Sequence, residues 1–235
     1  MTRQAEPEIK TYETDDELCG AVVQLAIERI RVGLSSHNIF HLALTGGVTG
    51  TLVTEQLVAI WNQTPSSYAG LHLWWGDERF VPEMSDERNA RPVSQYLRSH
   101  GAIHVHEAPS SDIAIDLQAA TEEYRTEVEG IQMDLALFGV GPDGHVASLF
   151  PGLWNASETR DVIAVQNSPK PPLSRITFSM EKINSSKSIW LLAAGENKRH
   201  AVIEIFARDK VIPASFIHGT QETLLFLDRA SNPSQ

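Results

Sequence analysis

Asp143 and His145 are the residues of this 235-residue chain whose types and spacing point most directly to chemistry. They stand two positions apart in a glycine-rich segment, Gly139–His145, which follows a run of apolar residues. A neutral histidine can take a proton from water, and a neighbouring carboxylate can hold its ring in the required orientation. The pair therefore predicts a general base, His145, oriented by Asp143. The alternative at this point is a histidine that only satisfies the hydrogen bonds of a loop.

The first part of this segment, residues 139–144, matches the G-x-G-x-x-G pattern of dinucleotide-binding folds. The context argues against that function, because Asp143 would place a carboxylate against a pyrophosphate and no acidic residue ends the next apolar run, Val162–Val165. Ser148 lacks the G-x-S-x-G surroundings of a nucleophile and is predicted to cap a helix. We therefore favour neither a dinucleotide site nor nucleophilic catalysis.

A second glycine-rich segment, Thr45–Gly50, links an apolar run to a helical pattern. Gly46 and Gly47 would let the backbone present N–H groups to an anion at the helix N-terminus, with Thr49 beside them. The same residues would also suit a tight turn whose hydroxyls cap the helix. Because the Gly-Lys-Ser/Thr ending of a P-loop is missing, nucleoside triphosphate binding is disfavoured.

Three cations follow apolar runs or a proline cluster: Arg79, Arg175 and Lys198. Arg79 stands after two carboxylates, where a guanidinium could orient a substrate oxygen or a phosphate. Each of the three could instead be a solvated surface charge. On a chain with a formal net charge of −11, however, local cations are the groups that could attract an anionic substrate.

Composition excludes several classes of protein. The acidic charge opposes general binding of nucleic acid, and no apolar run is long enough to cross a membrane. The polar start, Met1–Lys10, has neither the basic nor the apolar region of a secretory signal, so a cytoplasmic location is expected. A monomer and a small homo-oligomer both remain open.

Cysteine and histidine usage gives no sign of a metal site. Cys19 is the only cysteine and is predicted to be a buried structural thiol. The other histidines show no H-E-x-x-H or comparable spacing, so metal catalysis is not supported. They are His37, His41, His72, His100, His104, His106, His200 and His218.

Apolar runs of strand length alternate with helical patterns along the chain. The first helix is expected at Asp15–Val32, with Asp15 or Asp16 as its N-cap. This alternation predicts one α/β domain over residues 1–235, with a doubly wound, mainly parallel sheet covered by helices on both faces. Strands are expected at Ile39–Leu44, Leu71–Trp75, Met133–Phe138, Val162–Val165, Ile189–Ala194 and Leu224–Leu227, and further helices at Thr49–Trp61, Asn89–Arg98, Asp112–Glu129 and Asn197–Ala207.

Ligands of open parallel sheets bind at the carboxyl ends of the strands. The segments Thr45–Gly50, Gly76–Arg79, Gly139–His145 and Gly195–Lys198 each follow a predicted strand, so we expect them on one edge of the sheet. The stretch Asn155–Ser179, with three prolines, is expected to be an excursion rich in loops.

These motifs, in this order, closely resemble the 6-phosphogluconolactonases. The shared signatures are Leu44–Gly47, Trp75–Pro82, Gly139–Gly152, Arg175–Thr177 and Gly195–Lys198. The resemblance implies a glucosamine-6-phosphate isomerase-like α/β fold and hydrolysis of 6-phospho-D-glucono-1,5-lactone without a cofactor. It further implies that the phosphate binds Gly46, Gly47, Thr49, Arg175 and Lys198, and that Arg79 or backbone N–H groups stabilise the oxyanion.

The sequence departs from the family pattern in two places. Val48 and Gly50 stand where the glycine loop commonly has Ser and Pro, and residues 86–89 replace a common Asp-Ser-Asn. Two alternatives to the lactonase stay open. Glucosamine-6-phosphate deaminases share the Asp-Gly-His step, but they continue toward Phe-Asn-Glu-Pro, whereas this chain continues Val146-Ala147-Ser148. A non-catalytic sugar-phosphate-binding regulator on the same fold is the other.

Overall fold

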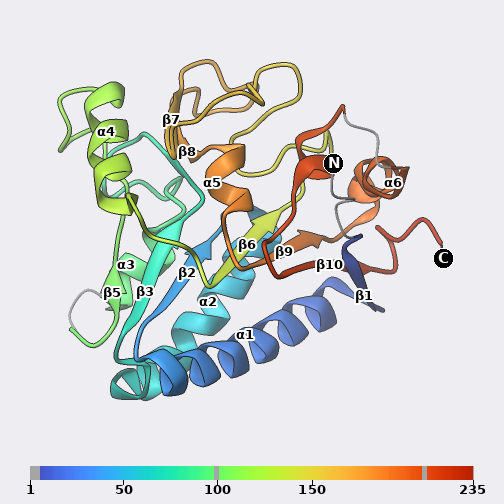
Figure 1. Cartoon of the computed structure of the whole chain (residues 1–235), viewed down its shortest axis with the longest axis horizontal. Coiled ribbons are helices and arrows are strands. Elements are labelled where there is room, and N and C mark those ends of the chain that lie inside the picture. Colours follow the sequence, from blue (N-terminus) through green and yellow to red (C-terminus); the bar gives the residue numbers. More distant parts are fainter. Residues whose placement is uncertain (1–5, 98–100, 208–210, 235) are drawn as a thin grey trace.

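The computed structural model describes residues 6–97, 101–207 and 211–234, and a seven-stranded sheet forms its centre (Figure 1). Every neighbouring pair of strands in this sheet is parallel. The order across the sheet is β1-β10-β9-β6-β2-β3-β5. The strands are β1 (Glu8–Tyr12), β2 (Phe40–Leu44), β3 (Leu71–Trp75), β5 (His104–Val105), β6 (Leu135–Gly139), β9 (Ser188–Ala193) and β10 (Glu222–Asp228).

Helices cover both faces of this sheet, as the sequence predicts. Strand β2 shows why, because Leu42 and Leu44 belong to one buried apolar cluster and Ala43 to another. The first cluster contains residues of α1 (Asp15–His37), α2 (Gly47–Gln63) and α3 (Arg91–Leu97). The second contains residues of α4 (Leu117–Val128), α5 (Met180–Asn184) and α6 (Arg199–Ala207). Short 3-10 helices lie at η1 (Pro65–Tyr68), η2 (Glu196–Lys198) and η3 (Pro213–Phe216).

A second, antiparallel sheet was not predicted from the sequence. It has three strands in the order β4 (Asp77–Arg79), β8 (Arg175–Phe178) and β7 (Val162–Val165). The prediction that Val162–Val165 joins the main sheet is therefore wrong. Residues 155–179, expected to be loop-rich, supply two of the three strands. Pairing of β4 with β8 places Arg79 opposite Arg175, and so joins two segments that the sequence analysis treated separately.

Several helix boundaries differ from the predicted ones for identifiable reasons. Thr14 caps α1 by accepting a hydrogen bond from the Glu17 N–H, in place of Asp15 or Asp16. Helix α4 begins at Leu117 with Asp116 as its N-cap, because Asp112 accepts a hydrogen bond from the Glu83 N–H instead of starting a helix.

Helix α3 starts two residues later than predicted, because the carboxylate of Glu78 binds the N–H groups of Asn89 and Ala90. Its predicted last residue, Arg98, lies outside the described residues. The predicted helix Asn197–Ala207 instead begins as the 3-10 turn η2 and continues as α6.

The single cysteine is buried, as expected, and burial raises the pKa of the Cys19 thiol to about 11. No helix of the described residues is long and apolar enough to span a membrane.

Candidate active site

A cleft of about 340 Å³ opens at the carboxyl ends of the central strands. The four segments expected on one edge of the sheet all contribute to its walls, which confirms their predicted convergence. Seven of the eight predicted site residues line the cleft: Gly46, Gly47, Thr49, Arg79, His145, Arg175 and Lys198. The eighth, Asp143, lies directly behind His145.

A tight turn after β6 fixes the position of His145. The Gly141 N–H donates to the His145 carbonyl over 2.8 Å, and Gly144 adopts a positive φ of 77°. A Cβ on Gly141 would lie 1.9 Å from Nδ1 of His145, so only glycine lets the ring fold back over the turn. The ring packs against Phe150, with 4.7 Å between the ring centroids. The sequence of the loop thus determines where the imidazole points.

His145 and Asp143 form the predicted pair. Nδ1 of His145 lies 2.5 Å from Oδ1 of Asp143, which leaves Nε2 as the nitrogen able to accept a proton. Burial lowers the pKa of His145, and the hydrogen bond that its ring donates to Asp143 only partly opposes this. Burial of Asp143 would raise the pKa of its carboxyl, but the hydrogen bond with His145, the charge of that ring, a backbone hydrogen bond and the charge of Lys170 together outweigh burial and lower it. The imidazole is therefore neutral, and the carboxylate ionised, near neutral pH.

The glycine loop presents the start of α2 to the same cleft. Gly46 is the N-cap residue and no side chain caps the first turn, so the helix begins without a side-chain acceptor for its N–H groups. Gly47 has a positive φ of 77°, which favours glycine. A Cβ on Gly46 would lie 1.9 Å from Oδ1 of Asn89, so this side chain closes over the loop. Val48, where the family commonly has Ser, is 81% exposed.

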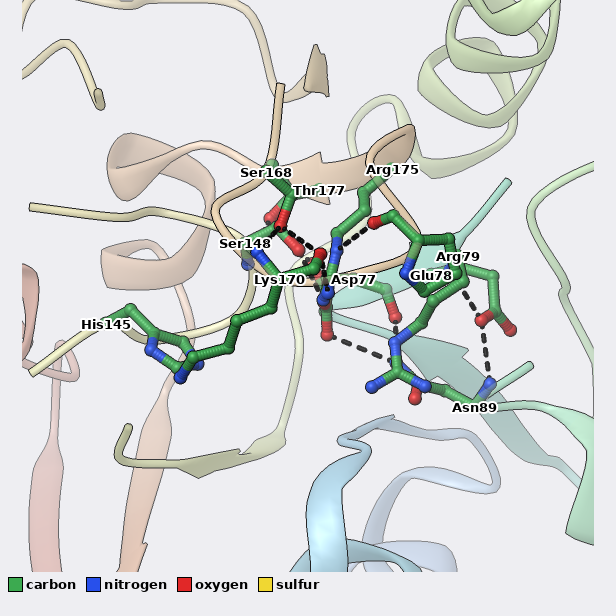
Figure 2. Close-up of polar contacts among 12 residues, drawn as sticks. Asp77, Glu78, Arg79, Asn89, His145, Ser148, Ser168, Lys170, Arg175 and Thr177 are labelled. Carbon is green, nitrogen blue, oxygen red and sulfur yellow. Dashed lines mark hydrogen bonds and ion pairs between the residues drawn. The ribbon is translucent and has the colours of Figure 1, made fainter. Parts of the chain in front are cut away.

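Strand β4 contributes two buried carboxylates with separate tasks (Figure 2). Glu78 accepts hydrogen bonds from the N–H groups of Arg79, Asn89 and Ala90, and thus ties residues 89–90 to the strand. Burial raises the pKa of the Glu78 carboxyl, although Arg88 opposes this. Asp77 lines the cleft, accepts a 2.7 Å hydrogen bond from Oγ of Ser148, and contacts Nδ2 of Asn89 at 3.3 Å.

These contacts settle the place of Ser148. It lies in a turn, so its predicted role as a helix cap is wrong. Its buried hydroxyl donates to Asp77 and not to His145, so the two residues do not form a nucleophile–base pair in this structure. Asp77 and Asn89 were not predicted as cleft residues, although Asp77 stands in the strand-end motif Gly76–Arg79.

The three predicted cations differ in their hydrogen bonds and in their burial. Arg79 donates from Nη1 to the Glu87 carbonyl over 2.6 Å, while its Nε is buried without a hydrogen-bond partner among the described residues. Lys198 lines the cleft from η2, and burial lowers the pKa of its ammonium, with a further contribution from the charge of Lys170.

Arg175 is buried and has a structural task as well as a place in the cleft. It donates to the carbonyls of Lys170, Pro171 and Pro172 at 2.9–3.2 Å. Its Nη1 lies 3.9 Å from Oδ2 of Asp77, and burial lowers the pKa of the guanidinium. Nη1 is thus the atom of Arg175 best placed to meet a ligand.

Lys170 is a fourth cation near the cleft, and the sequence analysis missed it. Its Nζ lies 3.7 Å from Oδ1 of Asp143, the oxygen that also contacts His145. The flanking prolines Pro169, Pro171 and Pro172 marked a constrained segment, but nothing in the sequence indicated what it faces. Among the described residues, no group of three or more His, Cys, Asp or Glu side chains could hold a metal ion.

Comparison with known proteins shows the family of this chain. Residues 13–226 match the family model described as glucosamine-6-phosphate isomerases/6-phosphogluconolactonase. The chain belongs to this family. Its members include the 6-phosphogluconolactonase of Mycobacterium tuberculosis, 35% identical over 237 residues, which cover 94% of this chain and 95% of that protein. The 6-phosphogluconolactonase of Streptomyces coelicolor is 34% identical over 243 residues, which cover 96% and 93%.

Solved structures in the family share the fold over nearly the whole chain. The crystal structure of 6-phosphogluconolactonase from Thermotoga maritima has a TM-score of 0.81 at 27% identity, covering 95% of this chain and all of that one. A monomeric glucosamine-6-phosphate deaminase has a TM-score of 0.76 at 20% identity, so it shares the fold alone. Because proteins of both names share this fold, the site must decide between the two activities.

Proposed function

We propose that the chain hydrolyses 6-phospho-D-glucono-1,5-lactone to 6-phospho-D-gluconate. The observation that carries the proposal is His145, held by Asp143 at the wall of a cleft that Arg79, Arg175 and Lys198 also line. The lactonase names of the relatives support the same substrate. A lactone is a reactive ester, so a general base and good positioning suffice for its hydrolysis.

Substrate binding starts with the phosphate. In the proposed complex it accepts hydrogen bonds from the N–H groups of Gly46 and Gly47 and from the Thr49 hydroxyl, at the start of α2. Lys198 and Nη1 of Arg175 supply positive charge for the phosphate on a chain whose formal net charge is −11. This arrangement holds the lactone carbonyl toward His145.

The chemical step begins at Nε2 of His145. It takes a proton from a water molecule, whose oxygen forms a bond to the lactone carbonyl carbon. The carbonyl oxygen becomes an oxyanion, which Arg79 or backbone N–H groups stabilise. As the carbonyl re-forms, the bond from this carbon to the ring oxygen breaks, and the imidazolium returns its proton to the leaving oxygen. Asp143 holds the ring and stabilises the imidazolium between these two steps.

The test is an assay of purified protein with freshly prepared 6-phosphogluconolactone, in which acid release is followed above the spontaneous rate. Glucosamine 6-phosphate is the control substrate, assayed for ammonia. Rapid acid release without ammonia is the expected result. Ammonia release would assign the protein to the deaminases, and binding without turnover of either compound would make it a regulator. Either outcome overturns the proposal.

A further inference from the structure

Buried side chains hold the backbone of Lys170 at the edge of the cleft. Its carbonyl accepts hydrogen bonds from Nη2 of Arg175 over 2.9 Å and from Oγ of Ser168 over 2.9 Å. The Ser168 N–H in turn donates to the Leu173 carbonyl, which closes the loop. Ser168 and Arg175 are both at most 5% exposed. Two hydrogen bonds from buried side chains therefore anchor the backbone carbonyl of this surface lysine.

The Lys170 side chain extends from this anchored backbone toward the catalytic pair (Figure 2). Its ammonium and Nδ1 of His145 contact the same oxygen, Oδ1 of Asp143, at 3.7 Å and 2.5 Å. An imidazolium at His145 would thus face a second positive charge across one carboxylate oxygen. A neutral imidazole meets no such repulsion.

We propose that Lys170 is a positioning residue that acts through Asp143, keeping His145 in its neutral, proton-accepting form and holding the carboxylate in place. The inference deepens the proposed function and rests on His145 as its general base. It assigns Lys170 no contact with substrate.

The other charges around His145 are consistent with this assignment. Asp143 on the same loop and Asp77 on β4 both favour the imidazolium, whereas Lys170 on the loop before β8 opposes it. Arg79, Arg175 and Lys198 line the same cleft from β4, β8 and η2. The half-exposed Lys170, unlike these three cations, forms an ion pair with Asp143. Its removal should therefore change the pKa of His145 most directly.

The experiment compares the wild type with Lys170→Gln, Lys170→Met and Lys170→Arg in the dependence of kcat/KM on pH. Without the ammonium, the imidazolium of His145 becomes more stable. As pH falls, Lys170→Gln and Lys170→Met should therefore lose activity at a higher pH than the wild type does. We expect roughly three- to tenfold lower kcat/KM on the acid side of the profile, and values within about threefold of wild type near pH 8. Lys170→Arg should keep the wild-type profile.

The control removes one positive charge elsewhere. Lys10 lies on the edge strand β1, where it pairs with Glu8. Lys10→Gln should leave the profile unchanged. An unchanged profile in Lys170→Gln together with a raised KM would make Lys170 a substrate ligand, and a uniform loss of kcat at every pH would make it structural. Both results overturn the inference.

A second measurement does not depend on turnover. Titration of the His145 ring by NMR in the wild type and in Lys170→Gln should show the variant holding its proton to a higher pH. Identical titration curves would overturn the inference even if the protein is a lactonase. Absence of lactonase activity in the wild type would instead overturn the proposed function, with the titration still reporting the effect of Lys170.

Discussion

Among single residues, the proposed general base His145 should set the pH range in which the enzyme works. Burial lowers the pKa of this histidine, and a general base acts only when deprotonated. Activity should therefore be lost as pH falls through a value below the ordinary histidine pKa of about 6.5. Initial rates between about pH 4.5 and about pH 8, corrected for spontaneous hydrolysis, give this profile. An acid limb above the ordinary histidine value would contradict the assignment.

Lys198 should contribute to the preference of the enzyme for phosphorylated over unphosphorylated lactone. Lys198→Ala removes one charge-assisted hydrogen bond to phosphate, typically about 1.5–3 kcal/mol, or roughly 10–150-fold in kcat/KM. Unphosphorylated gluconolactone does not make this contact, so its turnover should fall much less.

Measurement of kcat/KM on both lactones tests this prediction, with Lys10→Ala as the control for loss of a distant charge. Equal losses on the two substrates would place Lys198 in folding or in the chemical step. Arg175 is a less clean probe, because it also holds the carbonyls of Lys170, Pro171 and Pro172.

Among the helices and strands, Asn89 approaches the start of α2 so closely that a side chain at position 46 has no room. The φ of −91° at Gly46 suits any residue, so the obstacle to a side chain is the space taken by the Asn89 amide. Gly46→Ala should lower the free energy of unfolding by about 1–3 kcal/mol, as overpacking commonly does. Urea denaturation measures this loss.

A matched control distinguishes space from backbone strain. Gly47→Ala meets no atom within 4 Å but imposes a side chain on a positive φ, so it should cost about 1–2 kcal/mol for a different reason. Replacing Asn89 by Ala should relieve the cost of Gly46→Ala and leave that of Gly47→Ala unchanged. Equal costs of Gly46→Ala in both backgrounds would show that Asn89 is not the obstacle.

The sequence predicted the elements that carry a local periodic signal, and it missed those made by distant pairing. The buried strands and the large helices α1 and α2 are strongly patterned. Strands β4 and β8 are three and four residues long and lie about a hundred residues apart, so no local pattern shows that they pair. For the same reason the contacts of Asp77 with Ser148 and of Lys170 with Asp143 could not be predicted, although all four residues were visible.

Considered as a whole molecule, the protein carries a cluster of stacked histidines that includes His41 and His72, near the amino-terminal ends of β2 and β3. His72 stacks on His104 and His106, with ring centroids 4.3 Å and 5.1 Å apart, and its Nδ1 lies 2.9 Å from Nε2 of His106. His41 packs against His72 at 4.8 Å and accepts a hydrogen bond from Trp74. Burial, and then the neighbouring histidines, lower the pKa of His72 to about 4. Burial also lowers the pKa of His41.

This cluster should make the fold sensitive to acid. A histidine whose pKa is lower in the folded than in the unfolded state binds more protons when unfolded. The free energy of unfolding should therefore decrease as pH falls from about 6.5 toward about 4. Below that pH, the contribution of this histidine changes little. Urea midpoints across this range should fall with pH, and His72→Gln should flatten the dependence. The exposed His200→Gln is the control; an equally steep fall in His72→Gln would contradict this account.

In the proposed mechanism, His145 activates water in a cleft that binds the substrate independently of this residue. The most direct test is steady-state kinetics of His145→Ala on 6-phosphogluconolactone, with His200→Ala as the control histidine. Loss of a general base predicts a kcat lower by roughly 10²–10⁴-fold with KM close to that of the wild type, because the phosphate contacts remain. A variant that keeps the wild-type kcat would contradict the account and make His145 a structural residue.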